Sequence, residues 1–234
     1  VDWEIAPRQI VGITGKSGCG KSTMAKLIQG LYRPQSGLVG LDNIDLRLLD
    51  LSHIRSQVSL VSAESYFFPG TIRENISRPM PNSSMDRITW ATKKVFAHEE
   101  IESFPDAYET FLEENASNIS TGLRQKFAIA RALIRNPRIL ILDDAMSGFD
   151  VDSEIKLYDG LPDIALGRTV IIVSNRLYHL RLCNKIFVLD NGKISQQGSF
   201  ENLKNEPGFF GETYNKQTSI LGGSPVNKVL KKAV

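Results

Sequence analysis

The segment Gly15–Ser22, with the sequence GKSGCGKS, constrains the fold more than any other part of the chain. It fits the pattern G-x-x-x-x-G-K-[ST] at every fixed position. An apolar strand, Arg8–Gly15, runs into the segment, and a helix, Ser22–Leu31, follows it. The glycines let backbone N–H groups turn inward on a phosphate, and the helix N-terminus adds partial positive charge. The segment therefore predicts a phosphate-binding loop, and the alternative is a plain Gly/Ser turn that caps a helix.

Two residues of this loop have distinct expected roles. Lys21 is expected to reach the β- and γ-phosphates of a nucleotide, and the Ser22 hydroxyl is expected to ligate Mg²⁺. Cys19 is expected to pack beside the phosphates rather than to act as a nucleophile, because no base stands next to it. The ATP-binding residues that we predict are Gly15, Lys16, Ser17, Gly18, Cys19, Gly20, Lys21, Ser22 and Thr23.

A pair of carboxylates follows a second apolar strand. The run Arg138–Asp143 is rich in Ile and Leu, which is typical of a strand buried on both faces. Asp143 is expected at the carboxyl end of this strand, where it would hold Mg²⁺ together with Ser22. The side chain of Asp144, the next residue, points to the opposite side from Asp143 and is expected to contact a water molecule rather than the metal. The alternative is a helix N-cap with a neighbouring acid.

Strands alternate with helices along the chain, which predicts an α/β fold with a largely parallel sheet. Short strand patterns occur at 58–62, 139–142, 170–174 and 185–189, and DNGK at 190–193 predicts a hairpin turn. The segment 63–136 changes to helical patterns broken by prolines. We therefore predict a P-loop core with a mixed or parallel sheet, residues 1–62 and 137–211, a helical subdomain, 63–136, and a C-terminal tail, 212–234, whose end is a candidate short helix.

Composition excludes several classes of function. The chain has 234 residues and a net charge of +2, so charge alone predicts no attraction to nucleic acid. Its two cysteines show no metal-ligand spacing, and neither do its three histidines. The longest apolar runs are too short to span a bilayer. Because the chain begins in mid-pattern at Val1, we expect a domain of a longer polypeptide whose remainder carries membrane spans.

With these motifs in order, the sequence resembles the nucleotide-binding domain of an ATP-binding-cassette (ABC) exporter. GKSGCGKST resembles the Walker A motif, and TGLRQKFAIARALIRNPRILILDDAMSGFD resembles the signature helix, Walker B strand and D-loop. YFFPGTIRENI, TFLEENASNIS and TVIIVSNRL resemble the segment after the Q-loop, the X-loop and the switch-histidine strand. The resemblance implies the ABC ATPase architecture, ATP and Mg²⁺ as ligands, and head-to-tail pairs that sandwich ATP between Walker and signature motifs.

The departures from the family pattern fall on its catalytic positions. Asp144 stands where the family usually has glutamate, Asn175 where it has histidine, and Ala63 where it has the Q-loop glutamine. Asp144 keeps the negative charge, but its side chain is one methylene shorter. Asn175 carries no positive charge, and the Ala63 side chain can contact neither the metal nor the water. In the signature, Ser120 and Gly122 are kept, while Thr121 replaces a glycine. The resemblance therefore implies that Mg-ATP binding is retained and that hydrolysis is weak or absent.

Three functions remain open from sequence. The first is an exporter domain that couples ATP-dependent dimerisation to transport, with a transmembrane domain and a second nucleotide-binding domain as partners, at the cytoplasmic face of a membrane. The second is an active ATPase in which Asp144 suffices. The third is a soluble ABC ATPase without a membrane domain. No nucleic-acid partner is expected.

Arg73 and Glu74 lie in the segment that resembles the docking site for coupling helices of the membrane domain, and a solvated helix start is the alternative.

Overall fold

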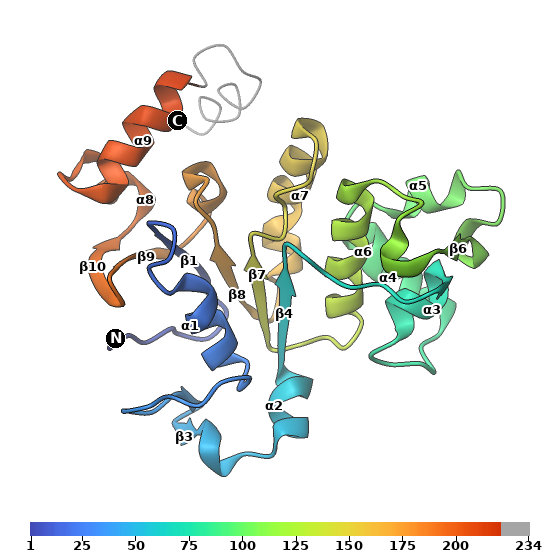
Figure 1. The fold of residues 1–234 in the computed structure, drawn as a ribbon, viewed down its shortest axis with the longest axis horizontal. Helices are drawn as coiled ribbons and strands as arrows, with labels where there is room; N and C mark the ends of the chain where they lie inside the picture. Colours follow the sequence, from blue (N-terminus) through green and yellow to red (C-terminus); the bar gives the residue numbers. More distant parts are fainter. Residues whose placement is uncertain (221–234) are drawn as a thin grey trace. The chain divides into compact units, whose positions relative to one another are not determined.

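The computed structural model describes residues 1–220, and it divides the chain into two compact units (Figure 1). Unit 1 consists of residues 1–60, 138–144 and the chain from Gly167 onwards. Unit 2 consists of residues 61–137 and 145–166. The candidate short helix at 226–234 lies outside the described residues.

A mixed sheet organises unit 1, as the sequence predicts. Its strand order is β10-β9-β1-β8-β7-β4. β1 pairs in parallel with β8 and β9, β7 pairs in parallel with β8, and the hairpin partner β10 runs antiparallel to β9. The strands are β1 (Ile10–Gly15), β4 (Val58–Ser62), β7 (Ile139–Asp143), β8 (Thr169–Val173), β9 (Lys185–Asp190) and β10 (Lys193–Gly198).

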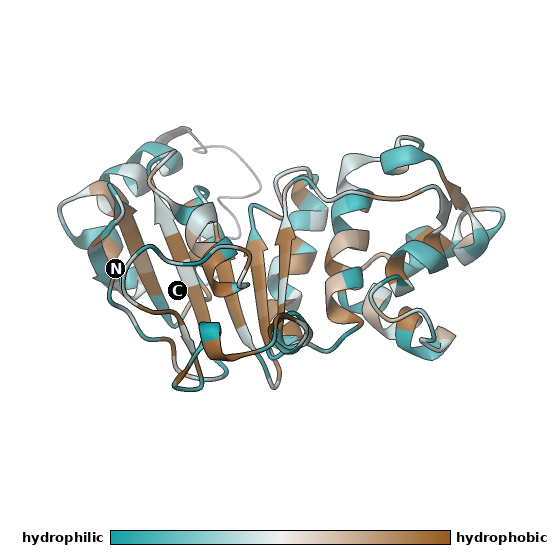
Figure 2. Ribbon diagram, turned by 60° about the horizontal axis from the view of Figure 1, so that its bottom comes forward, coloured by the Kyte–Doolittle hydropathy of each residue, from teal (hydrophilic) through white to brown (hydrophobic). Residues whose placement is uncertain are grey.

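Burial explains why these segments form strands. All six residues of β1 and all five of β8 are buried, which is the pattern of strands covered on both faces. β10 instead alternates between exposed and half-buried residues, as an edge strand does. Figure 2 shows hydrophobic residues along the strands of this sheet. The turn between β9 and β10 has positive φ at Asn191 and Gly192, which fits the expected two-residue hairpin.

The helices of unit 1 follow the phosphate loop and close the chain. They are α1 (Lys21–Ile28), α2 (Leu51–Gln57), α8 (Phe200–Asn205) and α9 (Phe209–Ile220), with short 3-10 turns η1 (Leu46–Leu48) and η4 (Leu177–Leu180). A small hairpin, β2 (Gly40–Leu41) and β3 (Ile44–Asp45), lies between α1 and α2 in sequence. The sequence pattern did not predict α8 and α9. α9 crosses the predicted boundary between the core, which was expected to end at residue 211, and the tail, which was expected to begin at 212.

Unit 2 is mainly helical. It contains α3 (Ile72–Ser77), α4 (Met85–Lys94), α5 (His98–Glu102), α6 (Thr121–Leu133) and α7 (Val151–Ile164), the short strands β5 (Gly70–Thr71) and β6 (Phe111–Leu112), and 3-10 turns η2 (Ala107–Glu109) and η3 (Glu114–Ala116). The expected division assigned residues 145–166 to the core, whereas they cluster here with unit 2. α7 packs against α4, and an ion pair joins Lys94 to Asp163. Within residues 1–220, no helix combines the length and hydropathy required to cross a bilayer.

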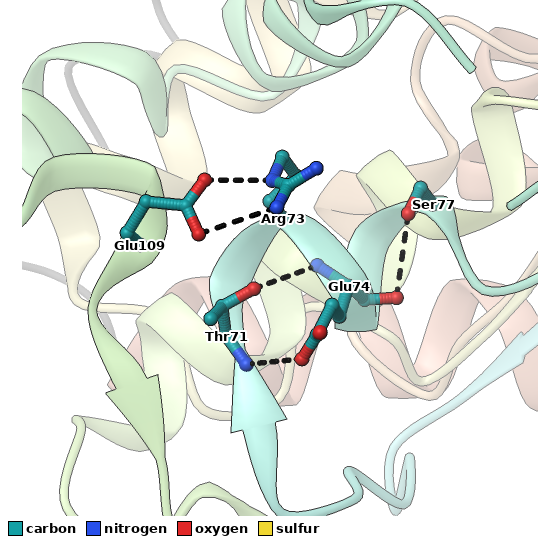
Figure 3. A network of polar contacts seen from close by, with 5 residues as sticks. All are labelled: Thr71, Arg73, Glu74, Ser77 and Glu109. Carbon is teal, nitrogen blue, oxygen red and sulfur yellow. Dashed lines mark hydrogen bonds and ion pairs between the residues drawn. The ribbon is translucent and has the colours of Figure 1, made fainter. Parts of the chain in front are cut away.

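The start of α3 is fixed by a reciprocal cap (Figure 3). The Thr71 hydroxyl accepts a hydrogen bond from the Glu74 backbone N–H at 3.1 Å, and the Glu74 carboxylate accepts one from the Thr71 N–H at 2.8 Å. Beside it, Arg73 donates to Glu109 at 2.7 Å. The Glu109 contact raises the pKa of the Arg73 guanidinium. Glu74 is therefore engaged in capping, while the exposed Arg73–Glu109 pair lies on the surface.

This cap predicts a local stability effect. Thr71→Ala removes the acceptor for the Glu74 N–H, and it should cost about 1 kcal/mol of stability, or roughly 2–4 °C in melting temperature for a chain of this size. Thr71→Ser keeps the acceptor and is the matched control. Thermal unfolding followed by circular dichroism measures both. An equal loss in the two variants would show that the Thr71 methyl group, and not the cap, supports this helix.

Candidate functional site

The phosphate loop wraps around the amine of Lys21. The Lys21 Nζ donates to the carbonyl oxygens of Gly15 at 2.8 Å and Lys16 at 3.0 Å, and it lies 3.8 Å from the Cys19 Sγ. Lys21 is buried, with 7% of its surface exposed. Carbonyl oxygens carry only partial negative charge, so the ammonium group has no full counter-charge in these contacts. A phosphate placed over the loop would supply that charge.

The backbone of the loop is shaped for close approach by a ligand. Gly15, Gly18 and Gly20 all have positive φ, at 147°, 79° and 104°. At Gly15 an added Cβ would lie 2.1 Å from the Leu189 carbonyl oxygen, whereas at Gly18 and Gly20 it would meet nothing within 4 Å. The first turn of α1 has no side-chain cap, so its N–H groups remain available to an anion. These features fit the triphosphate of ATP.

Asp143 ends β7 beside the loop. Its carboxylate accepts a hydrogen bond from the Ser22 hydroxyl. Burial raises the pKa of the Asp143 carboxyl, and the negative charge of Asp144 raises it further. The Ser22 bond and the positive charges of Lys21 and Lys26 act in the opposite direction. A buried carboxylate next to a hydroxyl is suited to a hard cation such as Mg²⁺, which would offset the cost of burying the charge.

A protein cage for the metal is absent from the described part of the chain. No group of three or more His, Cys, Asp or Glu side chains in residues 1–220 has the arrangement to hold a metal ion. Mg²⁺ usually takes one or two protein ligands and completes its shell with phosphate oxygens and water. Ser22 and Asp143 match that requirement, so the metal would depend on bound nucleotide.

Asp144 occupies a special backbone conformation. Its φ is 48°, in the left-handed region, and its N–H donates to the Val173 carbonyl at 3.0 Å. Aspartate and asparagine are the non-glycine residues that adopt this conformation at least cost, because their short side chains bond locally. Asp144 is half-buried. Its hydrogen bond to Val173 ties the residue that follows β7 to the end of β8.

Asn175 follows β8 at the same edge of the sheet. The neighbouring Ser174 N–H donates to the Ile13 carbonyl at 3.0 Å, which joins this loop to β1. The Asn175 side chain is exposed. Within residues 1–220 it makes no hydrogen bond, so its amide is available to a ligand. Lys21, Ser22, Asp143, Asp144 and Asn175 therefore all lie in unit 1, around the ends of β1, β7 and β8.

The signature residues lie in unit 2, at the start of α6. The Ser120 hydroxyl caps the helix by accepting from the Leu123 N–H at 3.2 Å. Thr121 accepts from the Arg124 guanidinium at 2.9 Å. Gly122 lies against the loop before α7, since an added Cβ would be 3.2 Å from the Gly148 carbonyl oxygen. Leu123 is buried, as suits an apolar side chain.

Gln125 is a buried polar residue that the sequence patterns did not single out. Its Nε2 donates to the Ala63 carbonyl at 3.3 Å and to the Ser147 hydroxyl at 3.1 Å, and its Oε1 accepts from the Gly148 N–H at 2.8 Å. Ala63 thus takes part through its backbone only. Gln125 holds the segment after β4, the loop before α7 and the helix α6 together within unit 2. The sequence signal that could have identified Gln125 is its place among the buried positions of the amphipathic helix α6.

Four further aromatic, acidic, histidine and cysteine side chains of unit 1 and unit 2 have structural roles. Trp3 packs edge-on against Phe187 of β9, with ring centroids 4.8 Å apart. Asp150 is the N-cap of α7 and accepts from the Ser153 N–H at 2.9 Å. His179 is buried and shares a hydrogen bond with Ser174 at 2.9 Å. Cys183 is buried, and burial strongly raises the pKa of its thiol, so it is unsuited to nucleophilic chemistry.

Comparison with known proteins relates this arrangement to one family. The model of the ABC transporter family matches residues 1–147, more than half of the chain. The cyclolysin secretion/processing ATP-binding protein of Bordetella pertussis is 39% identical over 222 residues, which cover 95% of this chain and 31% of that protein. The mitochondrial potassium channel ATP-binding subunit of Rattus norvegicus is 40% identical over 229 residues, covering 96% of this chain and 32% of that protein.

A solved structure gives the same result for the fold. A bacterial Atm1-family ABC exporter with ATP bound matches with a TM-score of 0.89 and 32% sequence identity, over 92% of this chain and 38% of that one. The chain spans about a third of the length of the curated relatives that it matches. Family model, fold and relatives agree, and this chain belongs to the ABC transporter family, as an ATP-binding domain of the exporter kind.

Proposed function

We propose that this chain holds Mg-ATP and couples ATP-dependent dimerisation to the movement of a membrane domain, while it hydrolyses ATP slowly or not at all. The observation that carries the proposal is the contrast within one edge of the sheet in unit 1. The Lys21 amine, the Ser22 hydroxyl and the Asp143 carboxylate are assembled there with the chemistry that binding needs. The side chains at 144 and 175 at the same edge lack the chemistry that turnover needs.

Binding requires contacts to phosphate and metal, and those contacts are retained. The Lys21 amine donates to the carbonyl oxygens of Gly15 and Lys16, the α1 N-terminus lacks a side-chain cap, and Gly18 and Gly20 border open space. When bound, Mg²⁺ would neutralise charge between the β- and γ-phosphates, with Ser22 and Asp143 as its protein ligands. The backbone N–H groups proposed to contact the phosphates are those of Lys16, Ser17, Gly18, Gly20 and Thr23, while Cys19 donates its N–H to the Lys16 carbonyl at 3.2 Å and shapes the loop.

Turnover requires a carboxylate that orients the attacking water, and Asp144 is one methylene shorter than the usual glutamate. A misplacement of about 1 Å costs roughly 100-fold in rate. The left-handed φ of 48° at this position favours aspartate and gives a physical reason for the exchange. Asn175 offers an amide hydrogen bond without a positive charge. Ala63 offers only its carbonyl, which already accepts from Gln125.

Dimerisation would place a signature motif over the bound ATP of a second domain. Ser120, Thr121 and Gly122 are the residues proposed for this contact. Thr121 adds a Cβ and a methyl group where the family has glycine, and that methyl points toward the Gly148 backbone. The partner domain is either identical or a catalytically complete relative. A transmembrane domain of the same transporter is the second proposed partner, which places the chain peripherally at the cytoplasmic face of a membrane.

The first test concerns binding. Lys21→Ala removes a charge-assisted contact worth about 1.5–3 kcal/mol, so it should weaken Mg-ATP binding roughly 10- to 100-fold. Lys193→Ala, on the exposed strand β10, removes the same charge outside the loop and should leave the affinity unchanged. Isothermal titration calorimetry measures both. Absence of ATP binding by the unaltered chain would refute the proposed function outright.

The second test concerns turnover. The chain as it stands should release phosphate far more slowly than an ordinary exporter domain. Asp144→Glu combined with Asn175→His should raise the rate by about 100-fold or more, because it restores the reach of one side chain and the basic group of the other. Phosphate release under saturating Mg-ATP is the measurement, with the melting temperature recorded alongside.

A matched control separates reach from charge. Asp144→Asn keeps the length of the side chain and removes its charge, so it should give no gain in rate. If it lowers a substantial rate that the unaltered chain already shows, Asp144 suffices as the catalytic carboxylate and the chain is an active ATPase. If the chain hydrolyses ATP but assembles with no membrane domain, the soluble ABC ATPase is the better description.

A further inference from the structure

The loop that carries Asn175 is fixed from several sides. The Arg176 N–H donates to the Ser174 hydroxyl at 3.1 Å, and the same hydroxyl shares a hydrogen bond with the buried His179 at 2.9 Å. Ser174 itself is 1% exposed. These contacts determine the path of the backbone as it leaves β8. They leave two backbone groups of the turn to be satisfied from elsewhere, the Asn175 carbonyl and the Leu177 N–H.

Gln217 of α9 satisfies both groups with one side chain. Its Nε2 donates to the Asn175 carbonyl at 2.7 Å, and its Oε1 accepts from the Leu177 N–H at 3.0 Å. Gln217 is half-buried and lies 40 or more positions from the residues that it contacts. α9 also packs against η4, which begins at Leu177. The planar amide therefore spans Arg176 and fixes the peptide groups on either side of it.

This geometry requires both halves of an amide. Glutamate supplies the acceptor and lacks the donor, while lysine supplies a donor and lacks the acceptor. The Asn175 side chain is exposed and forms no hydrogen bond within residues 1–220, so the backbone at 175 determines where its Cβ lies and χ1 and χ2 remain free. A contact that fixes this backbone therefore limits the region that the amide group can reach when a ligand binds.

We propose that Gln217 is a positioning residue, which aims Asn175 at the terminal phosphate of bound ATP and so ties the nucleotide site to α9. The proposal rests on the proposed function and adds to it that Asn175 contacts the γ-phosphate, the contact that the family resemblance implies for the histidine usual at this position. Gln217 acts through the backbone and touches no ligand itself. Loss of its two hydrogen bonds should weaken the binding of ATP, which has a γ-phosphate, and spare the binding of ADP, which has none.

The test measures the affinities of the chain for Mg-ATP and Mg-ADP by calorimetry. Gln217→Met keeps the size of the side chain and removes both hydrogen bonds. It should lower the preference for ATP over ADP by about two- to tenfold, with little change for ADP. Hydrogen exchange at the Leu177 amide should quicken in the same variant. Gln217→Glu should lower the preference as well, because a carboxylate repels the Asn175 carbonyl, while the Leu177 amide stays protected.

Two reference variants make the result decisive. Asn215→Ala, at an exposed position of the same helix, should change neither affinity. Asn175→Ala should lower the ATP preference by itself, and adding Gln217→Met to it should have no further effect, since both act through the same side chain. Equal losses for ATP and ADP, no loss, or an undiminished loss in the Asn175→Ala background would overturn the positioning role.

The design also separates this role from the proposed function. If Asn175→Ala lowers the ATP preference and Gln217→Met does not, only the positioning role is refuted. If Asn175→Ala leaves the preference unchanged, the γ-phosphate role of Asn175 is refuted and the positioning role with it. If the unaltered chain fails to bind ATP, the proposed function fails at its first step.

Discussion

The parallel pairing of β8 with both β1 and β7 is the constraint on which the candidate site depends. Val173 is in register with Ile13 on one side and with Asp143 on the other. That register brings the carboxyl ends of three strands to one edge, where the phosphate loop, the two aspartates and Asn175 follow. A slip of one residue would turn Asp143 to the opposite face of the sheet. The buried Ile, Leu and Val side chains therefore serve function by fixing this register.

Local patterns predicted much of this arrangement. The phosphate loop has fixed spacing, and β4 was predicted with the bounds that the structure gives. Gln125 and Gln217 were not predicted, because each acts through hydrogen bonds to residues far away in sequence, such as the 62 positions between Gln125 and Ala63. Periodicity reports which face of a helix is buried, and it does not report what a polar group on that face contacts. α7 was assigned to the core for the same reason, since its packing against α4 is a tertiary contact.

Both missed glutamines bind backbone groups, and Gln125 also donates to the Ser147 hydroxyl. Gln125 fixes the carbonyl of Ala63 in unit 2, and Gln217 fixes the carbonyl of Asn175 in unit 1. Ala63 and Asn175 are two of the positions that our proposal treats as altered from the family pattern. Each glutamine therefore fixes, within its own unit, the backbone at one of these positions.

The most direct test of that proposal follows the fate of a single bound nucleotide. The chain would be mixed in excess with radiolabelled ATP and Mg²⁺, and the bound nucleotide would be recovered over hours and separated. Our account predicts that it is recovered as ATP, and that Asp144→Glu with Asn175→His converts it to ADP. Rapid conversion to ADP by the unaltered chain would contradict the account, because Asp144 and Asn175 would then be sufficient for turnover.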